Sequence, residues 1–188
     1  MIKCVCILGS TGSIGRQSLD VVRMYPQIRV GALTAGSSIA RLAEQCREFR
    51  PELAVVATKE GANELKQAIR DLPTRVLWGE EGLLAAATLE EADCVITAVV
   101  GMLGLKPTLA AIRAGKRIGL ANKETLVCAG ELVMAQAKQW GAEIVPVDSE
   151  HSAIFQCLMG CGDRREVRRL LLTCSGGPFF GMDREALS

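Results

Sequence analysis

The sequence predicts an α/β fold, in which a doubly wound parallel sheet is followed by the start of an α+β domain. Short apolar runs alternate with amphipathic stretches through about residue 150, which is typical of parallel strands joined by single helices. The first apolar run leads directly into a glycine-rich turn and a helix, and the alternation weakens after residue 150. Of the 188 residues, 49% are hydrophobic and 23% are charged, so we expect a packed core rather than disorder.

The individual elements follow from the length and period of each run. The apolar runs predict strands at residues 3–8, 28–34, 53–57, 75–78, 93–98, 117–120, 143–147 and 167–173. The amphipathic stretches predict helices at residues 14–24, 38–49, 60–71, 80–87, 105–114, 124–140 and 150–158.

Charge and composition exclude several classes of protein. The net charge of +1 gives no support for a nucleic-acid partner. No apolar run reaches the length of a membrane span, and the N-terminus reads as a strand rather than a signal peptide. The eight cysteines are scattered, mostly in apolar contexts, so we expect reduced, buried thiols in a cytoplasmic protein. A zinc site at His151, Cys157 and Cys161 is the alternative, but no second pair completes the spacing.

The motif Gly9-Ser10-Thr11-Gly12-Ser13-Ile14-Gly15 lies between the first strand and the first helix. In a dinucleotide-binding loop, Gly9 would allow the tight turn, Gly12 the approach of a pyrophosphate, and Gly15 the packing of helix on strand. The hydroxyl groups and the helix N-terminus would add donors for an anion. The motif therefore predicts a Rossmann-like nucleotide site, although Thr11 replaces the second glycine of the usual spacing. A glycine-rich turn without a ligand is the alternative.

The loop after the second strand bears on the choice of cofactor. It reads Gly36-Ser37-Ser38 and carries no Asp or Glu to hold the ribose 2′-hydroxyl of NAD. With Arg41 nearby, this loop is compatible with a 2′-phosphate and so favours NADP.

Two polar motifs follow later strands. Asn122-Lys123-Glu124 comes after strand 117–120, and Asp148-Ser149-Glu150 comes after strand 143–147. The carboxyl ends of parallel strands are where open α/β sheets bind ligands, and two carboxylates can ligate Mg²⁺ or Mn²⁺. Both motifs can also be read as helix caps with acidic first turns. The arginine cluster at 164–169 reads as a solvated face, with a phosphate site as the alternative.

Together these motifs resemble the 1-deoxy-D-xylulose 5-phosphate reductoisomerase family. The resemblance rests on residues 9–15, 121–127, 146–156 and 173–179, in matching order and spacing over essentially the whole chain. It implies rearrangement of a metal-bound phosphorylated ketose to an aldehyde, followed by reduction by NADPH to 2-C-methyl-D-erythritol 4-phosphate in isoprenoid biosynthesis.

The resemblance also implies residue roles. It assigns NADPH to Thr11, Gly12, Ser13, Ile14, Gly36, Ser37, Ser38, Asn122 and Glu124. It assigns the divalent metal to Asp148 and Glu150, the substrate to Lys123, Ser149, Glu150 and Ser175, and catalysis to Lys123 and Glu150. His151, the single histidine of the chain, is not assigned by the resemblance; a lone histidine is more often structural than catalytic, so we expect it in the outer shell of the metal at most. The family often has Lys or Asn where this chain has Ser37-Ser38.

The resemblance finally implies a domain division. Residues 1–150 would form the NADPH-binding domain, and residues 151–188 the incomplete start of a catalytic domain through which the family forms homodimers. Family members are much longer, and their flap, a third metal-ligating glutamate and further phosphate-binding residues would lie beyond residue 188. We therefore expect an N-terminal portion that does not turn over substrate alone. The alternatives are a semialdehyde-type NADP-dependent dehydrogenase, for which no cysteine stands in a suitable context, and a non-catalytic nucleotide-binding fragment.

Overall fold

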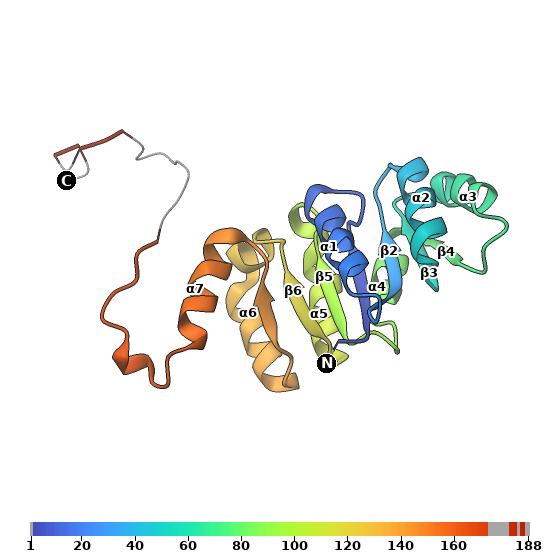
Figure 1. The fold of residues 1–188 in the computed structure, drawn as a ribbon. Helices are drawn as coiled ribbons and strands as arrows, with labels where there is room; N and C mark the ends of the chain where they lie inside the picture. The colour runs from blue at the N-terminus through green and yellow to red at the C-terminus, as the bar shows by residue number, and fades with distance from the viewer. Residues whose placement is uncertain (1, 173–180, 184, 187–188) are drawn as a thin grey trace. The chain divides into compact units, whose positions relative to one another are not determined.

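The structure, a computed structural model, describes residues 2–172, 181–183 and 185–186. They fall into two compact units, Met1–Val145 and Pro146–Ser188. The first unit is built on a seven-stranded sheet with the order β4-β3-β2-β1-β5-β6-β7 (Figure 1). Its strands are β1 (Cys4–Leu8), β2 (Arg29–Thr34), β3 (Leu53–Val56), β4 (Arg75–Trp78), β5 (Cys94–Thr97), β6 (Arg117–Leu120) and β7 (Ile144–Pro146).

The order of the strands places β1 at a switch in chain direction across the sheet. The chain winds outward from β1 to β4 on one side, then continues from β5 to β7 on the other. The pairs among β1–β6 are all parallel. In such sheets the crevice at the carboxyl ends of the strands beside the switch is the usual ligand site, so the loop after β1 lies where a ligand is expected.

Helices cover both faces of this sheet. They are α1 (Ser13–Met24), α2 (Ile39–Phe49), α3 (Lys59–Ala68), α4 (Gly79–Ala87), α5 (Leu105–Arg113) and α6 (Glu124–Trp140), with a 3-10 turn, η1 (Gly101–Gly104). One buried cluster joins the sheet to α1–α3, through side chains such as Leu19, Leu42 and Leu65. A second joins it to α4–α6, through side chains such as Ala86, Ile112 and Val133. The predicted doubly wound α/β architecture is confirmed.

The second unit contains α7 (Ser149–Met159) and a 3-10 turn, η2 (Arg164–Glu166). The predicted strand 167–173 is wrong for the residues that are described, because 167–172 carry no regular structure. A strand needs a neighbour for its N–H and C=O groups, and Leu170, Leu171 and Leu172 are all more than half exposed. Arg165, Arg168 and Arg169 are exposed, as the solvated-face reading of this cluster predicts.

The cysteine prediction is confirmed only in part. Cys4, Cys6, Cys46 and Cys94 are buried. Cys128 and Cys157 are exposed and Cys161 is half-buried, so the expectation of buried thiols is wrong for these three. They lie on or just after α6 and α7, where an apolar sequence context does not fix which helical face a side chain occupies. Cys174 lies outside the described residues. Among those that are described, no helix is long and apolar enough to cross a bilayer.

Candidate functional site

The phosphate loop, residues 9–15, has three glycines: two are required by close packing, and the third lies where a side chain would fit. Gly9 has φ +86°, and a Cβ there would lie 2.6 Å from the Ala98 carbonyl oxygen. A Cβ on Gly15 would lie 2.3 Å from the Gly9 carbonyl oxygen. Gly12 instead has φ −74° and ψ 178°, and its Cβ would approach only the Gly9 oxygen, at 3.4 Å. The backbone thus requires glycine at positions 9 and 15, while at position 12 the missing side chain leaves open space beside the start of α1.

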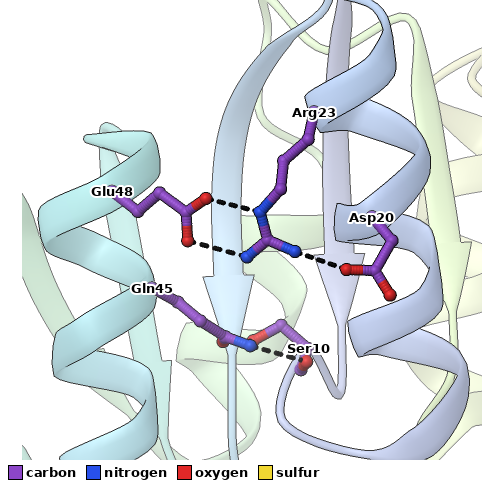
Figure 2. A network of polar contacts seen from close by, with 5 residues as sticks. All are labelled: Ser10, Asp20, Arg23, Gln45 and Glu48. Carbon is purple, nitrogen blue, oxygen red and sulfur yellow. Dashed lines mark hydrogen bonds and ion pairs between the residues drawn. The ribbon is translucent and has the colours of Figure 1, made fainter.

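Hydrogen bonds hold the base of this loop to β2 and α2. The Gly9 N–H donates to Thr34 Oγ1 at 2.9 Å, and the Ser10 N–H donates to the Thr34 carbonyl oxygen at 2.8 Å. Gln45 of α2 also contacts Ser10, and both residues are buried (Figure 2). The loop is therefore anchored on its inner side.

The outer side of the loop is suited to an anion. Gly12 is the N-cap of α1 and makes no side-chain cap. The first-turn N–H groups of an α-helix have no acceptor within the helix and carry a partial positive charge, so they bind phosphate well. Gly12 and Ser13 are exposed, and Thr11 and Ile14 are half-buried. The Gly12 N–H itself donates to the Gly9 carbonyl at 3.1 Å, so Gly12 contributes space rather than its own amide.

The loop after β2 lies beside the phosphate loop. Gly36, Ser37 and Ser38 are exposed, and Ser38 is the N-cap of α2 without a side-chain cap. Arg41, in the first turn of α2, donates to the Thr11 carbonyl oxygen at 3.4 Å. This arginine places a positive charge between the two loops, where the sequence suggested a 2′-phosphate.

A cavity of about 670 Å³ opens at the same edge of the sheet. It is lined by residues that follow β1–β5 and by the starts of α4 and α5, among them Gly9, Gly36 and Val99. An ion pair between Lys106 and Glu80, at 2.7 Å, forms part of the wall. The volume falls in the range of pockets for small molecules and cofactors, roughly 300–1,000 Å³. Of the residues assigned to NADPH from the sequence, only Gly36 lines this cavity.

Asn122 follows β6, and its amide is fully engaged within the protein. The side-chain NH₂ donates to the carbonyls of Val99 at 2.6 Å and Gly101 at 2.9 Å. The side-chain oxygen accepts from the Thr125 N–H at 3.1 Å and from the Thr125 hydroxyl. Because Asn122 is only 2% exposed, its side chain braces the turn after β5 and the start of α6. A cofactor contact through this side chain would have to break one of these bonds.

Lys123 and Glu124 open α6. Lys123 is its N-cap and is exposed, and Glu124 is half-buried in the first turn. A carboxylate at this position also stabilises the positive end of the helix. Both residues follow β6, which is separated from β1 by β5.

The second unit holds the two expected metal-binding carboxylates. Asp148 is the N-cap of α7, and its Oδ1 lies 2.7 Å from His151 Nδ1. Glu150 accepts from the Ser149 hydroxyl at 2.7 Å. The capping role noted as an alternative is therefore real, and it does not exclude metal binding. Within the described ranges, no three His, Cys, Asp or Glu side chains form a metal-binding cluster. Ser175 lies outside the described residues.

Sequence reasoning missed Gln45. It lies on the buried side of α2 beside Leu42 and Cys46, and a glutamine among apolar positions was the signal that could have identified it. A buried polar side chain is nearly always hydrogen-bonded, and here the partner is the phosphate loop.

The chain matches one family by sequence. Residues 5–130 match the family model of 1-deoxy-D-xylulose 5-phosphate reductoisomerase, and residues 144–188 match the model of its C-terminal domain. The reductoisomerase of Lachnospira eligens is 56% identical over 187 residues, 99% of this chain and 49% of that protein. The reductoisomerase of Heliobacterium modesticaldum is 57% identical and covers 100% of this chain and 48% of that protein. The chain thus spans about half the length of the curated relatives it matches.

Solved structures agree with this match. A crystal structure of DOX-P reductoisomerase in complex with NADPH, fosmidomycin and magnesium superposes with a TM-score of 0.79 at 46% identity, over 82% of this chain and 38% of that one. The Zymomonas mobilis enzyme in complex with NADPH gives a TM-score of 0.80 at 41% identity, over 84% of this chain and 41% of that one. These matches do not support the semialdehyde-type dehydrogenase alternative. The chain belongs to the 1-deoxy-D-xylulose 5-phosphate reductoisomerase family.

Proposed function

We propose that this chain forms the NADPH-binding part of a 1-deoxy-D-xylulose 5-phosphate reductoisomerase and supplies two carboxylates of its divalent-metal site. The observation that carries the proposal is the phosphate loop, which is anchored on its inner side and open at Gly12 against the N-terminus of α1. Relatives of high identity bear this enzyme's name, and a related structure contains NADPH.

The cofactor would lie along the carboxyl edge of the sheet. Thr11, Gly12, Ser13 and Ile14 would hold the pyrophosphate through the first-turn N–H groups of α1. Gly36, Ser37 and Ser38 would meet the adenosine end, with Arg41 as the positive partner of the 2′-phosphate. The cavity next to Gly9 gives the rest of the cofactor an apolar wall. Asn122 would act by shaping the turn after β5, and Glu124 would meet the cofactor near α6.

The metal and substrate groups would come from the later motifs. Asp148 and Glu150 offer the hard carboxylate oxygens that Mg²⁺ and Mn²⁺ prefer. The His151 ring, 2.7 Å from Asp148 Oδ1, would orient that carboxylate. A bound divalent ion supplies Lewis-acid polarisation of the ketose carbonyl and hydroxyl. Lys123 would add a positive charge beside the reacting centre, and Ser149, Glu150 and Ser175 would bind the substrate, a small phosphorylated ketose. We further propose a cytoplasmic homodimer for the protein that contains this chain.

The binding part of the proposal is tested by titrating the chain with NADPH and with NADH, following fluorescence of the reduced nicotinamide. We expect tighter binding of NADPH, and Arg41→Met should reduce this preference because it removes the positive charge near the 2′-phosphate. Arg113→Met is the matched control, since it removes an exposed arginine that donates to Gln136 and does not line the cavity. Absence of NADPH binding would refute the proposal.

The chemical part is tested in the protein that contains this chain. With 1-deoxy-D-xylulose 5-phosphate and Mg²⁺, oxidation of NADPH should depend on substrate and should be lost in Glu150→Gln. Turnover that persists in Glu150→Gln would exclude Glu150 from catalysis.

A further inference from the structure

Gln45 forms a buried two-point contact with the phosphate loop. Its Oε1 accepts from the Ser10 hydroxyl at 2.7 Å, and its Nε2 donates to the Ser10 carbonyl oxygen at 2.9 Å (Figure 2). A carbonyl oxygen can only accept, so the orientation of the amide is fixed by its partner. Gln45 is 6% exposed and Ser10 is 0% exposed, so water cannot replace either bond.

This contact is the buried part of the loop's anchorage to α2, whereas Arg41 of the same helix reaches the Thr11 carbonyl at the exposed side. The other inner bonds of residues 9 and 10 go to Thr34 at the end of β2. Together they place Ser10 between a strand end and α2, two residues before the open position at Gly12. The bonds from Thr34 and Gln45 thus fix the position of the loop relative to the start of α1.

A separate contact joins α1 and α2 at the surface. Glu48, three residues after Gln45, accepts from Arg23 Nε at 2.5 Å and from a terminal nitrogen of Arg23 at 2.7 Å, and Arg23 also contacts Asp20 (Figure 2). The Arg23 and Glu48 side chains are 45% and 44% exposed. Exposed ion pairs contribute little to the free energy of unfolding, whereas breaking a buried hydrogen bond leaves polar groups without partners.

We infer that Gln45 is a positioning residue for cofactor binding, one that sets the phosphate loop from below without touching the cofactor. The inference rests on the proposed NADPH site. The amide holds the Ser10 peptide in the orientation that starts the turn toward Gly12 and the first-turn N–H groups of α1. Without it, the loop still connects β1 to α1, but its N–H groups are no longer fixed in one arrangement before the phosphate arrives.

The test replaces Gln45 by Met, which keeps the length of the side chain and removes both bonds. We expect the dissociation constant for NADPH to rise about tenfold, because the Ser10 carbonyl loses its partner and the Ser10 hydroxyl keeps only the longer bond to the Thr34 carbonyl, at 3.2 Å. Glu48→Met removes the exposed contact between α1 and α2, and it should change the constant by less than about twofold. Ile112→Val, in α5, destabilises the core without contacting the loop, so it is the control for stability alone.

Amide hydrogen exchange of the ligand-free chain gives a second readout. The amides of Gly9, Ser10 and Gly12, which have acceptors within the loop and at Thr34, should exchange faster in Gln45→Met, whereas they should be unchanged in Ile112→Val at a comparable loss of melting temperature. This readout does not depend on NADPH. If the wild-type chain fails to bind NADPH, the proposed function is refuted, but the exchange data still test whether Gln45 positions the loop.

Two results would overturn the inference. One is wild-type NADPH affinity in Gln45→Met, and the other is an equal loss of affinity in Ile112→Val, which would make the effect a general loss of stability. If Gln45→Met does not fold, Ser10→Ala carries the same comparison, because it removes the hydroxyl bond to Gln45 and keeps the bond from Gln45 to the Ser10 carbonyl.

Discussion

Replacing Gly12 by Asp should separate cofactor binding from folding. The backbone at Gly12 has φ −74° and ψ 178°, which any residue adopts, and a Cβ there meets only the Gly9 oxygen, at 3.4 Å. Gly12 is also the N-cap of α1, where Asp is as good as or slightly better than Gly for the helix. The variant should therefore fold with an unchanged or slightly higher melting temperature.

The same aspartate would stand against the pyrophosphate. Two like charges about 4 Å apart repel by about 1 kcal/mol in water and about 4 kcal/mol at an effective dielectric constant of about 20. Gly12 is exposed, which favours the lower end, and a pyrophosphate presents more than one charge. A combined loss of about 2–3 kcal/mol corresponds to a roughly 30- to 150-fold rise in the dissociation constant.

The assay is a fluorescence titration with NADPH, paired with a thermal melt. Gly12→Asn is the matched variant, because Asn has the size and capping ability of Asp without the charge. It should weaken binding less than Gly12→Asp, and the difference measures the electrostatic part. Gly162→Asp adds the same charge in an exposed turn of the second unit, where a Cβ meets nothing within 4 Å, and should bind as wild type. Unchanged affinity in Gly12→Asp would remove the loop from the site.

Three further predictions concern stability, thiols and metal. Gly15→Ala should lower the free energy of unfolding by about 1–3 kcal/mol or more, because its Cβ would lie 2.3 Å from a backbone oxygen; urea denaturation with no loss would contradict this packing. Burial raises the pKa of Cys46 to about 12, so thiol reagents at pH 8 should label the exposed Cys128 before Cys46. Mass spectrometry measures the order of labelling, and early labelling of Cys46 would refute its burial. Asp148→Asn should weaken Mn²⁺ binding while α7 keeps its cap, since Asn caps as well as Asp, and Glu150→Gln is the companion variant. Mn²⁺ affinity equal to that of the wild type, measured by calorimetry, would place the metal elsewhere.

The sheet could be predicted from the sequence because its inner strands, such as β1 and β3, are buried on both faces. Such strands appear as short continuous apolar runs, and those from β1 to β7 were located to within one residue at either end. The same signal failed at 167–172, where Leu170-Leu171-Leu172 looks like a buried strand. An apolar run reports what a segment could bury, and it does not report whether a neighbouring strand is there to pair with it.

The motifs of the candidate site could be located from the sequence, but the contacts of their side chains could not. The sequence left open whether Asn122 caps a helix or meets the cofactor, and the answer depends on the carbonyls of Val99 and Gly101, about twenty residues earlier in the chain. Gln45 was missed for the same reason, since its partner Ser10 is 35 residues away. Contacts between distant segments determine what these amides do. A local pattern, such as a glutamine among apolar positions, indicates that the side chain has a partner but not which partner.

The packing around Asn122 has a consequence for how sequences of this fold can vary. Gly104 has an ordinary helical backbone, φ −76° and ψ −21°, so conformation alone would accept any residue there. A Cβ at that position would nevertheless lie 2.9 Å from Asn122 Oδ1. The two positions are therefore coupled by size, and Val99 Cγ2 at 3.1 Å is a further neighbour that would have to shift. A library randomised at 104 and 122 should return glycine at 104 wherever 122 stays Asn, and a larger residue at 104 together with a smaller one at 122. A variant that arises in one step at 104 would have to displace an amide that holds four hydrogen bonds, so the accessible route runs through position 122 first.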